Sequence, residues 1–329
     1  MKKLLTIFLL LAVAIGLTYY LASLESKKPN KNIKIRISVI PWPGYDLLYL
    51  AKKKGYFAEE GLDVELVEQL SATNQAVAFN NGHISAAATT INDALDNNVN
   101  WKNKMHFVSI LDYSNGGDVI IGQENIKTMQ DLKGKKVAVE DSALGDYMIN
   151  RALSIAGMTL DDVEIVNLSF TDGVKSMINK EVDGFVGFPP SSTEIQNSIP
   201  VNIIFDSTKI PGEIVDVLAV NDDLLFNHPD KVSAMVRAWN KALIYSKENP
   251  DELFKIMAEN NGLNNREEFE VILDEVYMPS IAEQKEIFKK KSMNATAYRI
   301  MKLLFSEEKL KTAPLPDAFI HDDIIKTIN

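Results

Sequence analysis

Aromatic, acidic and hydroxyl side chains follow several predicted strands of this sequence, and these residue types could bind a small molecule. Trp42 and Tyr45 come directly after the first predicted strand, where an aromatic ring could stack on a flat ligand or contact a cation. Thr89, Thr90 and Asn92 lie where another strand leads into a helix. Hydroxyl and backbone N–H groups at that point could bind a polar ligand, or they could simply cap the helix.

A polar stretch further along the chain adds four candidates: Asp112, Ser114, Asn115 and Asp118. Carboxylates in a cleft can hold amino or ring N–H groups through charge-assisted hydrogen bonds. The same residue types also form ordinary turns. We therefore predict that this stretch is either a hairpin turn or a hinge at which the chain crosses between two lobes.

Five candidates come from the middle of the chain. Ser142 and Gly145 stand at the start of a predicted helix, where backbone N–H groups point outward. Phe188 and Pro189 end a strand, and Asp216 lies on a later apolar strand. In open α/β sheets ligands bind at the carboxyl ends of the strands, so we expect all these residues to face one cleft.

The elements that must position these residues alternate between strand and helix. Apolar and polar residues alternate over 33–40, which is typical of a strand. Two more strands are predicted at 62–67 and 84–90, with helical patterns between them. A second unit of the same kind begins near residue 128, and the chain is strongly helical from about 229. This alternation predicts an α/β fold with open parallel sheets.

Composition narrows the classes of function. The net charge is −10, which argues against binding to nucleic acid or to anionic lipid. The chain has no cysteine, which excludes disulfides, thiol nucleophiles, cysteine-ligated zinc and a lipid-modified cysteine. Its four histidines are scattered, so we expect neither a metal site nor a cofactor. None of the arginines falls on a predicted cleft loop, which favours a neutral or cationic, nitrogen-bearing ligand.

The first 25 residues are predicted to be a targeting segment. Lys2 and Lys3 precede a nearly unbroken apolar run from Leu4 to Ala22, which is the pattern of a secretion signal. As a helix with a rise of about 1.5 Å per residue, this run would have a length close to the thickness of a bilayer core. A cleaved signal peptide and a retained membrane anchor both fit, and either would place the remainder on the periplasmic or extracellular side.

Four segments carry a recognisable pattern: Trp42-Pro43-Gly44-Tyr45, Leu48 to Leu66, Asp131 to Val139 and Lys180 to Gly184. They resemble the ABC-transporter substrate-binding proteins of the nitrate/sulfonate/taurine and thiamine-pyrimidine type, the NMT1/THI5-like family. The resemblance covers roughly residues 33–250. Where that family commonly has an acid before the proline that ends a later strand, this chain has Phe188, which could alter the pocket.

The resemblance implies a type II periplasmic-binding-protein fold, in which two lobes with central sheets close on a ligand. The first lobe would take residues 33–113 and 217–329, and the second 114–216. The implied function is to capture a small molecule for an ABC permease, as a monomer and without catalysis. Two alternatives stay open: a membrane-anchored sensor or adaptor, and a thiamine-pyrimidine-synthase-like enzyme.

Overall fold

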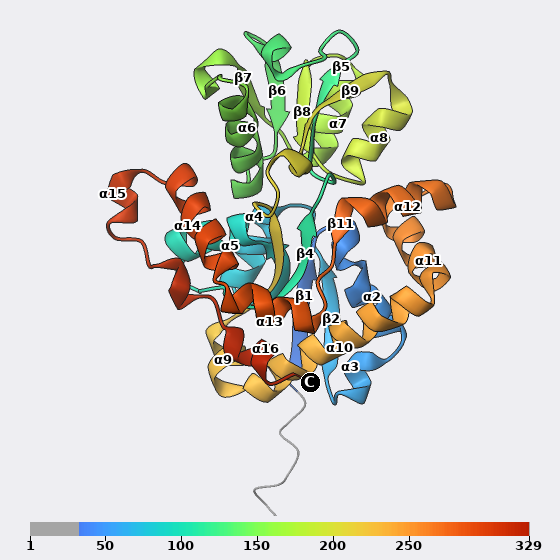
Figure 1. Cartoon of the computed structure of the whole chain (residues 1–329), viewed down its shortest axis with the longest axis vertical. Coiled ribbons are helices and arrows are strands. Elements are labelled where there is room, and N and C mark those ends of the chain that lie inside the picture. The colour runs from blue at the N-terminus through green and yellow to red at the C-terminus, as the bar shows by residue number, and fades with distance from the viewer. Residues whose placement is uncertain (1–32, 329) are drawn as a thin grey trace, which may run out of the picture. The chain divides into compact units, whose positions relative to one another are not determined.

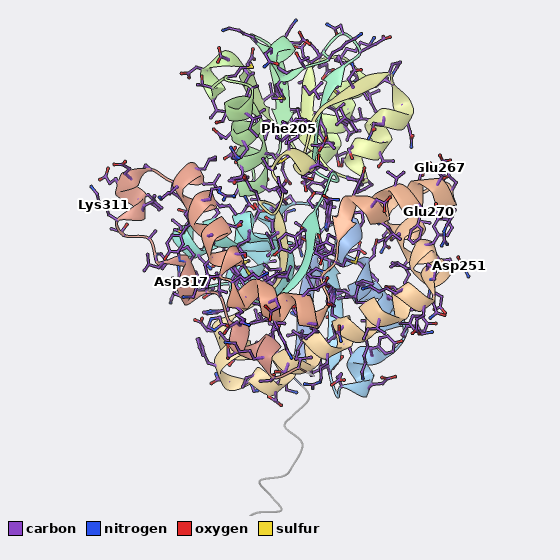
Figure 2. All side chains as sticks on the ribbon, in the orientation of Figure 1. Phe205, Asp251, Glu267, Glu270, Lys311 and Asp317 are labelled. Atoms are coloured by element: carbon purple, nitrogen blue, oxygen red, sulfur yellow. The ribbon has the colours of Figure 1, made fainter. Side chains whose placement is uncertain are left out.

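The computed structural model describes residues 33–328, and from Ile35 onward the chain forms one compact unit. The predicted signal peptide or anchor, residues 1–25, lies outside the described residues. Among the helices from residue 33 to 328, none combines the length and the apolar character needed to cross a bilayer. Charged side chains such as Glu267 and Lys311 lie on the outside, whereas Phe205 is buried between a sheet and its helices (Figure 2).

The first lobe is built on a six-stranded sheet. Its first strand alternates exposed and buried residues at its start, and its last three residues, Ile37 to Val39, are all buried. The next strand in the chain pairs at the edge, whereas the central strands are fully buried. The strands run in the order β11 (Val276–Tyr277), β4 (His106–Ser114), β10 (Val215–Val220), β3 (Ala86–Thr90), β1 (Lys34–Val39) and β2 (Asp63–Glu68).

Helices of the first lobe come from both ends of the chain. The loop after β1 enters a short helix that ends at Gly55, whose φ of 79° suits a residue without a side chain. Thr90 caps the helix after β3 through its hydroxyl. The longest helix starts at Pro229 and buries Trp239. These helices are α2 (Asp46–Lys53), α3 (Tyr56–Glu59), α4 (Ala72–Asn80), α5 (Ile91–Asn100), α9 (Asp222–Asn227), α10 (Pro229–Glu248), α11 (Pro250–Asn261), α12 (Arg266–Glu275), α13 (Ile281–Lys289), α14 (Ser292–Leu304), α15 (Glu307–Leu310) and α16 (Asp322–Lys326).

The second lobe has a five-stranded sheet, which Figure 1 shows above the first one. Its three parallel strands are β7 (Glu164–Asn167), β6 (Lys136–Val139) and β8 (Gly184–Gly187), in that order. β5 (Val119–Gln123) pairs antiparallel with β8, and the edge strand β9 (Val201–Asp206) pairs antiparallel with β5. The helices of this lobe are α6 (Ala143–Ile155), α7 (Phe170–Ile178) and α8 (Ser191–Ser198).

The chain passes from one sheet to the other between β4 and β5, and it returns between β9 and β10. Hydrogen bonds hold the two crossings together: Ser114 Oγ lies 2.8 Å from Ser207 Oγ, and the Ser207 N–H donates to the carbonyl of Asp118 at 2.9 Å. The hinge alternative for the polar stretch therefore describes it better than a hairpin within one sheet. The exact lobe boundaries stay a prediction.

Two details differ from the sequence-based expectation. Both sheets are mixed: β10 runs antiparallel to β3 and β4 in the first sheet, and β5 runs antiparallel to β8 and β9 in the second. The chain returns to the first sheet at the end where β4 left it. β10 therefore runs in the opposite direction to β4. Asp112 also lies inside β4 and not in the loop, since that strand continues to Ser114. The two-lobe α/β fold itself is confirmed.

Candidate functional site

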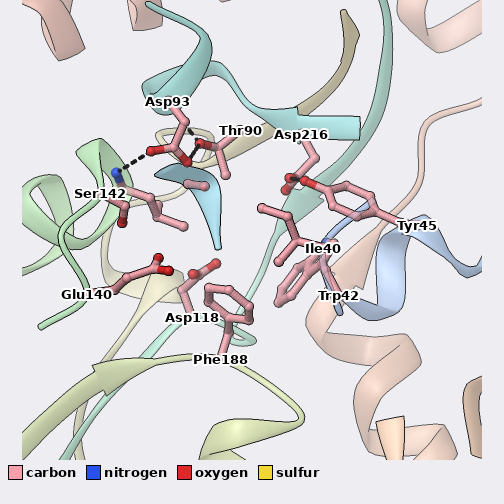
Figure 3. Close-up of a pocket in the computed structure, with 12 residues that line it drawn as sticks. Ile40, Trp42, Tyr45, Thr90, Asp93, Asp118, Glu140, Ser142, Phe188 and Asp216 are labelled. Atoms are coloured by element: carbon pink, nitrogen blue, oxygen red, sulfur yellow. Dashed lines mark hydrogen bonds between the residues drawn. The ribbon is translucent and has the colours of Figure 1, made fainter. Parts of the chain in front are cut away.

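A small cleft lies between the two lobes (Figure 3). Both lobes contribute walls. The first lobe supplies residues that follow β1 and β2, residues at and after the end of β3, and one residue of β10. The second lobe supplies residues next to β5, β6 and β8. The lining residues are Ile40, Trp42, Tyr45, Ala72, Thr90, Asp93, Asp118, Glu140, Ser142, Leu144, Phe188 and Asp216.

One wall is aromatic. The rings of Trp42 and Phe188 meet edge to face, with centroids 5.6 Å apart and planes at 88°. Trp42 comes from the first lobe and Phe188 from the second. The indole Nε1 of Trp42 donates to both carboxylate oxygens of Asp112, at 3.1 and 3.3 Å. Gly44 leaves room for this contact, because a Cβ at that position would lie 2.0 Å from Asp112 Oδ2.

Neighbouring strands of the first sheet bring two carboxyl groups together, and the short turn after β1 adds a tyrosine. Asp216 of β10 stands opposite Asp112 of β4 and opposite Thr90 of β3. The Tyr45 hydroxyl donates to Asp216 Oδ1. Burial and the adjacent Asp112 raise the pKa of Asp216 well above its ordinary value. Asp216 lines the cleft, and Asp112 lies directly behind it, bonded to Trp42.

Three further carboxyl groups surround the remaining space. Burial raises the pKa of Asp118 to about 7, and burial together with the charge of Asp93 raises that of Glu140 to about 8. Burial also raises the pKa of Asp93 to about 6, although hydrogen bonds from Thr90 and Leu144 counteract it. The residues from 33 to 328 that line the cleft include no lysine, arginine or histidine. The cleft is thus short of positive charge.

The carboxyl groups differ in the hydrogen bonds that they accept from the protein itself. Asp93 accepts from Thr90 Oγ1 at 2.7 Å and from the Leu144 N–H at 3.2 Å. Asp216 accepts from Tyr45. Glu140 Oε1 is buried and has no hydrogen-bond partner within the described residues. Since a buried acceptor without a donor is costly, Glu140 is the group that a ligand would satisfy.

This set of carboxyl groups makes the ligand-free protein more stable as the pH falls from 8 to 6.5. In the unfolded chain these groups titrate near pH 4 and stay ionised over this interval, whereas folded Glu140 and Asp118 take up protons. A native state that binds more protons than the unfolded state gains stability on acidification. We expect the free energy of unfolding, measured by urea titration, to rise by about 2 kcal/mol.

The variant Glu140→Gln isolates this effect. It should be more stable than the wild type at pH 8 and should show a flatter pH dependence down to 6.5. Asp141→Asn is the control, because it removes one charge from the adjacent, exposed position; its charge is the smallest contribution to the raised pKa of Glu140, so it should change the slope far less. A wild-type stability that is flat or falls on acidification would contradict the assignment of raised pKa values to the cleft.

The structure brings half of the fourteen predicted site residues into the cleft. Asp112 lies directly behind them and bonds Trp42. Thr89 and Asn92 are buried in the first lobe, and their side chains have no hydrogen-bond partner among the residues that the structure describes. Gly145 is buried in the first turn of α6, where its N–H donates to Ser142 Oγ. The seven that line the cleft are Trp42, Tyr45, Thr90, Asp118, Ser142, Phe188 and Asp216.

Three predicted residues lie on other surfaces. Ser114 and Asn115 border an outer groove beside Tyr113 and Tyr277. The hydroxyl of Ser114 bonds the hydroxyl of Ser207 in the second crossing, and the side-chain amide of Asn115 donates to the carbonyl of Asp274. Pro189 borders a separate groove next to α8. Nothing in this geometry directs these three at the cleft.

Sequence reasoning missed two of the acidic groups. Glu140 directly follows β6, so its position at a strand end was the signal that could have identified it. Asp93 stands three residues after the helix cap Thr90 and reads as part of a helix start. Its role depends on the second lobe coming within hydrogen-bond distance, which no local pattern encodes. The other unpredicted lining residues are Ile40, Ala72 and Leu144.

Comparison with known proteins finds a family model described as NMT1/THI5 like, which matches residues 42–253. A Brucella abortus protein named "Putative binding protein" is 26% identical over 253 residues, which cover 75% of this chain and 76% of the relative. The formylaminopyrimidine-binding protein of Halalkalibacterium halodurans is 22% identical, over 80% of this chain and 81% of that protein. The 4-amino-5-hydroxymethyl-2-methylpyrimidine phosphate synthase of Schizosaccharomyces pombe is 20% identical, over 63% of each chain.

Among solved structures, the alkanesulfonate-binding protein SsuA of Xanthomonas axonopodis pv. citri, bound to MOPS, matches with a TM-score of 0.70. The match covers 89% of this chain and 99% of that protein, at 15% sequence identity. At that identity the likeness establishes the two-lobed binding-protein fold and leaves the ligand open.

Proposed function

This chain belongs to the NMT1/THI5-like family, and we propose that it is an extracytoplasmic solute-binding protein whose ligand is a small nitrogen-bearing heterocycle or amine. One observation carries the ligand class: the buried Oε1 atom of Glu140, a residue that lines the cleft, has no hydrogen-bond partner within the described residues. A protonated nitrogen or an N–H group would give it a charge-assisted hydrogen bond. Figure 3 shows Glu140 and Asp118 on the same side of the cleft as Phe188.

The aromatic wall supports the same ligand class. The ring faces of Trp42 and Phe188 attract cations and stack on flat heterocycles. A bare metal ion fits less well, because within residues 33–328 no group of three or more histidine, aspartate or glutamate side chains is arranged to hold one. The ligand therefore combines a flat or apolar body with at least one N–H donor.

Binding without catalysis is the reading that the side chains favour over a pyrimidine synthase. The cleft lining within the described residues includes no histidine that could act as a base. Its serine, Ser142, accepts the Gly145 N–H at 3.1 Å and so serves as a helix cap. The synthase relative keeps the enzyme alternative specific: turnover of a pyrimidine precursor by the purified protein would contradict our proposal.

The transport setting is part of the same proposal. A solute-binding protein of this fold would act as a monomer outside the cytoplasm and would deliver its ligand to an ABC permease. The apolar segment at residues 1–25 would direct export, either as a cleaved signal or as an anchor. An anchored protein that reports ligand occupancy to a partner is the second candidate, and the retained anchor would favour it.

A thermal-shift screen of the purified protein tests the ligand class. The panel contains aminopyrimidines, purines and polyamines on one side, and nitrate, taurine and alkanesulfonates on the other. A ligand at 100 times its Kd adds about 2.7 kcal/mol to native stability, which shifts the melting temperature by several degrees. Stabilisation by nitrogen heterocycles or amines is the expected result. Stabilisation by the anions alone would overturn the ligand class.

Glu140→Gln should weaken binding of the best nitrogenous ligand by about 10- to 100-fold, since a hydrogen bond to a charged group contributes about 1.5–3 kcal/mol. The amide keeps the shape of the side chain, but it cannot ionise and replaces one acceptor oxygen by an NH2 donor. Isothermal titration calorimetry measures the change, with Asp141→Asn as the matched exposed control. Equal affinities of Glu140→Gln and the wild type would show that this carboxylate does not contact the ligand.

A further inference from the structure

The N-terminus of α6 opens into the cleft. This helix has 13 residues, and its cap, Ser142, accepts the Gly145 N–H at 3.1 Å. Its first turn lines the cleft through Leu144. Free N–H groups and the positive end of the helix dipole make such a helix start a ready site for an anion.

In this protein a side chain of the opposite lobe already occupies that position. Asp93, in the first turn of α5, accepts the Leu144 N–H at 3.2 Å through Oδ1 (Figure 3). Its other oxygen accepts from Thr90 Oγ1 at 2.7 Å, and Thr90 Oγ1 in turn accepts the Asp93 N–H at 3.1 Å. Thr90 thereby fixes the carboxylate on its own helix while the carboxylate reaches across the cleft.

We propose that Asp93 is a specificity-determining residue, a built-in anion that fills the start of α6 and excludes anionic solutes from the cleft. This inference goes beyond the proposed function, because it concerns which ligands are rejected and holds whichever nitrogenous ligand is accepted. A second observation shows that ligand space lies beside it: Glu140 Oε1 is buried in the same cleft and unpartnered within the described chain.

The rejection follows from charge and from competition for donors. An incoming sulfonate or nitrate would have to displace Asp93 from the Leu144 N–H. It would then lie among the carboxyl groups of Asp93, Asp118 and Glu140, with no cationic side chain in the described lining to offset them. Specificity of this kind comes from a repulsive element as much as from an attractive one.

Removing Asp93 should therefore create an anion site. The probe is ethanesulfonate, titrated into the purified full-length protein by calorimetry. Because Glu140 and Asp118 also repel anions, the informative pair is Asp93→Gly/Glu140→Gln against Glu140→Gln alone. We expect the double variant to bind ethanesulfonate at least about tenfold more tightly, a change of about 1.4 kcal/mol. Asp93→Gly alone should show a smaller gain in the same direction.

Asp96→Asn is the matched control, because it removes one charge from the next turn of the same helix, where Asp96 accepts from Asn100. It should gain no affinity for ethanesulfonate. Equal sulfonate binding by the double variant and Glu140→Gln, or tight binding by the wild type, would overturn the proposal. Circular dichroism confirms that each variant is folded before titration.

Nuclear magnetic resonance gives a readout that does not depend on a gain of binding. The amide proton of Leu144 should shift as the Asp93 carboxyl titrates, with a midpoint near its pKa of about 6. In Asp93→Asn this titration should disappear, whereas it should persist in Asp96→Asn. A Leu144 amide that ignores pH in the wild type would show that Asp93 does not occupy the start of α6 in solution.

Discussion

Replacing Glu213 by alanine should lower the free energy of unfolding by about 2–4 kcal/mol at pH 7, the largest loss of stability that we expect from a single polar residue. Glu213 lies in the connection from β9 to β10 and is 6% exposed. It accepts from Arg151 at 2.7 and 2.9 Å, from Tyr147 at 2.7 Å and from Arg299 at 3.1 Å. Alanine would leave all these donors without their common acceptor.

The network matters because its members come from three parts of the fold. Tyr147 and Arg151 belong to α6 of the second lobe, Arg299 belongs to α14 of the first lobe, and Glu213 belongs to the hinge between them. Both arginine side chains keep some contact with water, at 23% and 51% exposure, so the expected loss is smaller than for a fully buried pair. Removing Glu213 should loosen the contact between the lobes as well as the hinge.

The pH dependence of this effect can be worked out from the pKa of Glu213. Burial alone would raise it, but the hydrogen bonds from Arg151 and Tyr147 lower it more, so it lies below the ordinary 4.5. A lowered carboxyl pKa contributes stability that is complete above the unfolded value and is lost as the pH falls through the folded value. The difference between wild type and variant should thus be full at pH 7 and shrink below about pH 4.5.

Urea titration measures the difference, and Asp251→Ala is the control. Asp251 also accepts from an arginine, Arg266, but its side chain is 83% exposed on the outer face of the first lobe (Figure 2). An exposed pair of this kind contributes about 0–1 kcal/mol. If Glu213→Ala costs no more than Asp251→Ala, the buried network does not hold the lobes together.

Local sequence patterns predict the parts of this protein that depend on neighbouring residues. The alternation in β1 and the caps at Thr90 and Ser142 are each set within a few positions of the chain. The family resemblance predicted the two-lobed arrangement. The α/β pattern predicted that the cleft lies at the ends of the strands. Trp42 and Tyr45 were found in this way, because they follow the first strand directly.

What the sequence could not supply is the pairing of residues far apart in the chain. Asp216 meets Asp112 only through the register of β10 against β4, and their spacing in sequence carries no sign of it. Asp93 meets Leu144 only because α5 and α6 belong to different lobes that face each other. Ser114 and Asn115 have the same residue types as true cleft residues, yet they lie at the end of β4 beside an outer groove and not in the cleft.

Replacing Trp42 by alanine should reduce the affinity for a nitrogenous ligand by about 100-fold, or about 2.7 kcal/mol, the largest effect on binding that we expect. Trp42 is 6% exposed and lies between the lobes. Its ring meets Phe188 of the second lobe, and its Cη2 atom would be 2.7 Å from a Cβ at Gly117 in the hinge. Alanine would remove both the aromatic wall and the contact between the lobes.

Trp42→Phe separates the two roles of this side chain. Phenylalanine keeps a ring for stacking but cannot donate to Asp112, which now accepts from the indole at 3.1 Å. We expect a loss of about tenfold, because the buried Asp112 would lose its donor and the back wall would reorganise. If phenylalanine binds as well as tryptophan, the ring alone positions the ligand and the indole N–H is dispensable.

Tryptophan fluorescence and calorimetry measure these changes, and Trp101→Ala is the matched control. The chain has three tryptophans; Trp239 is fully buried in the first lobe, and Trp101 is 41% exposed and does not line this cleft. Ligand-induced changes in emission should therefore vanish in Trp42→Ala and persist in Trp101→Ala. Wild-type affinity in a folded Trp42→Ala protein would mean that the ligand binds outside the cleft, because no ligand could occupy this space without touching the indole that closes it on one side.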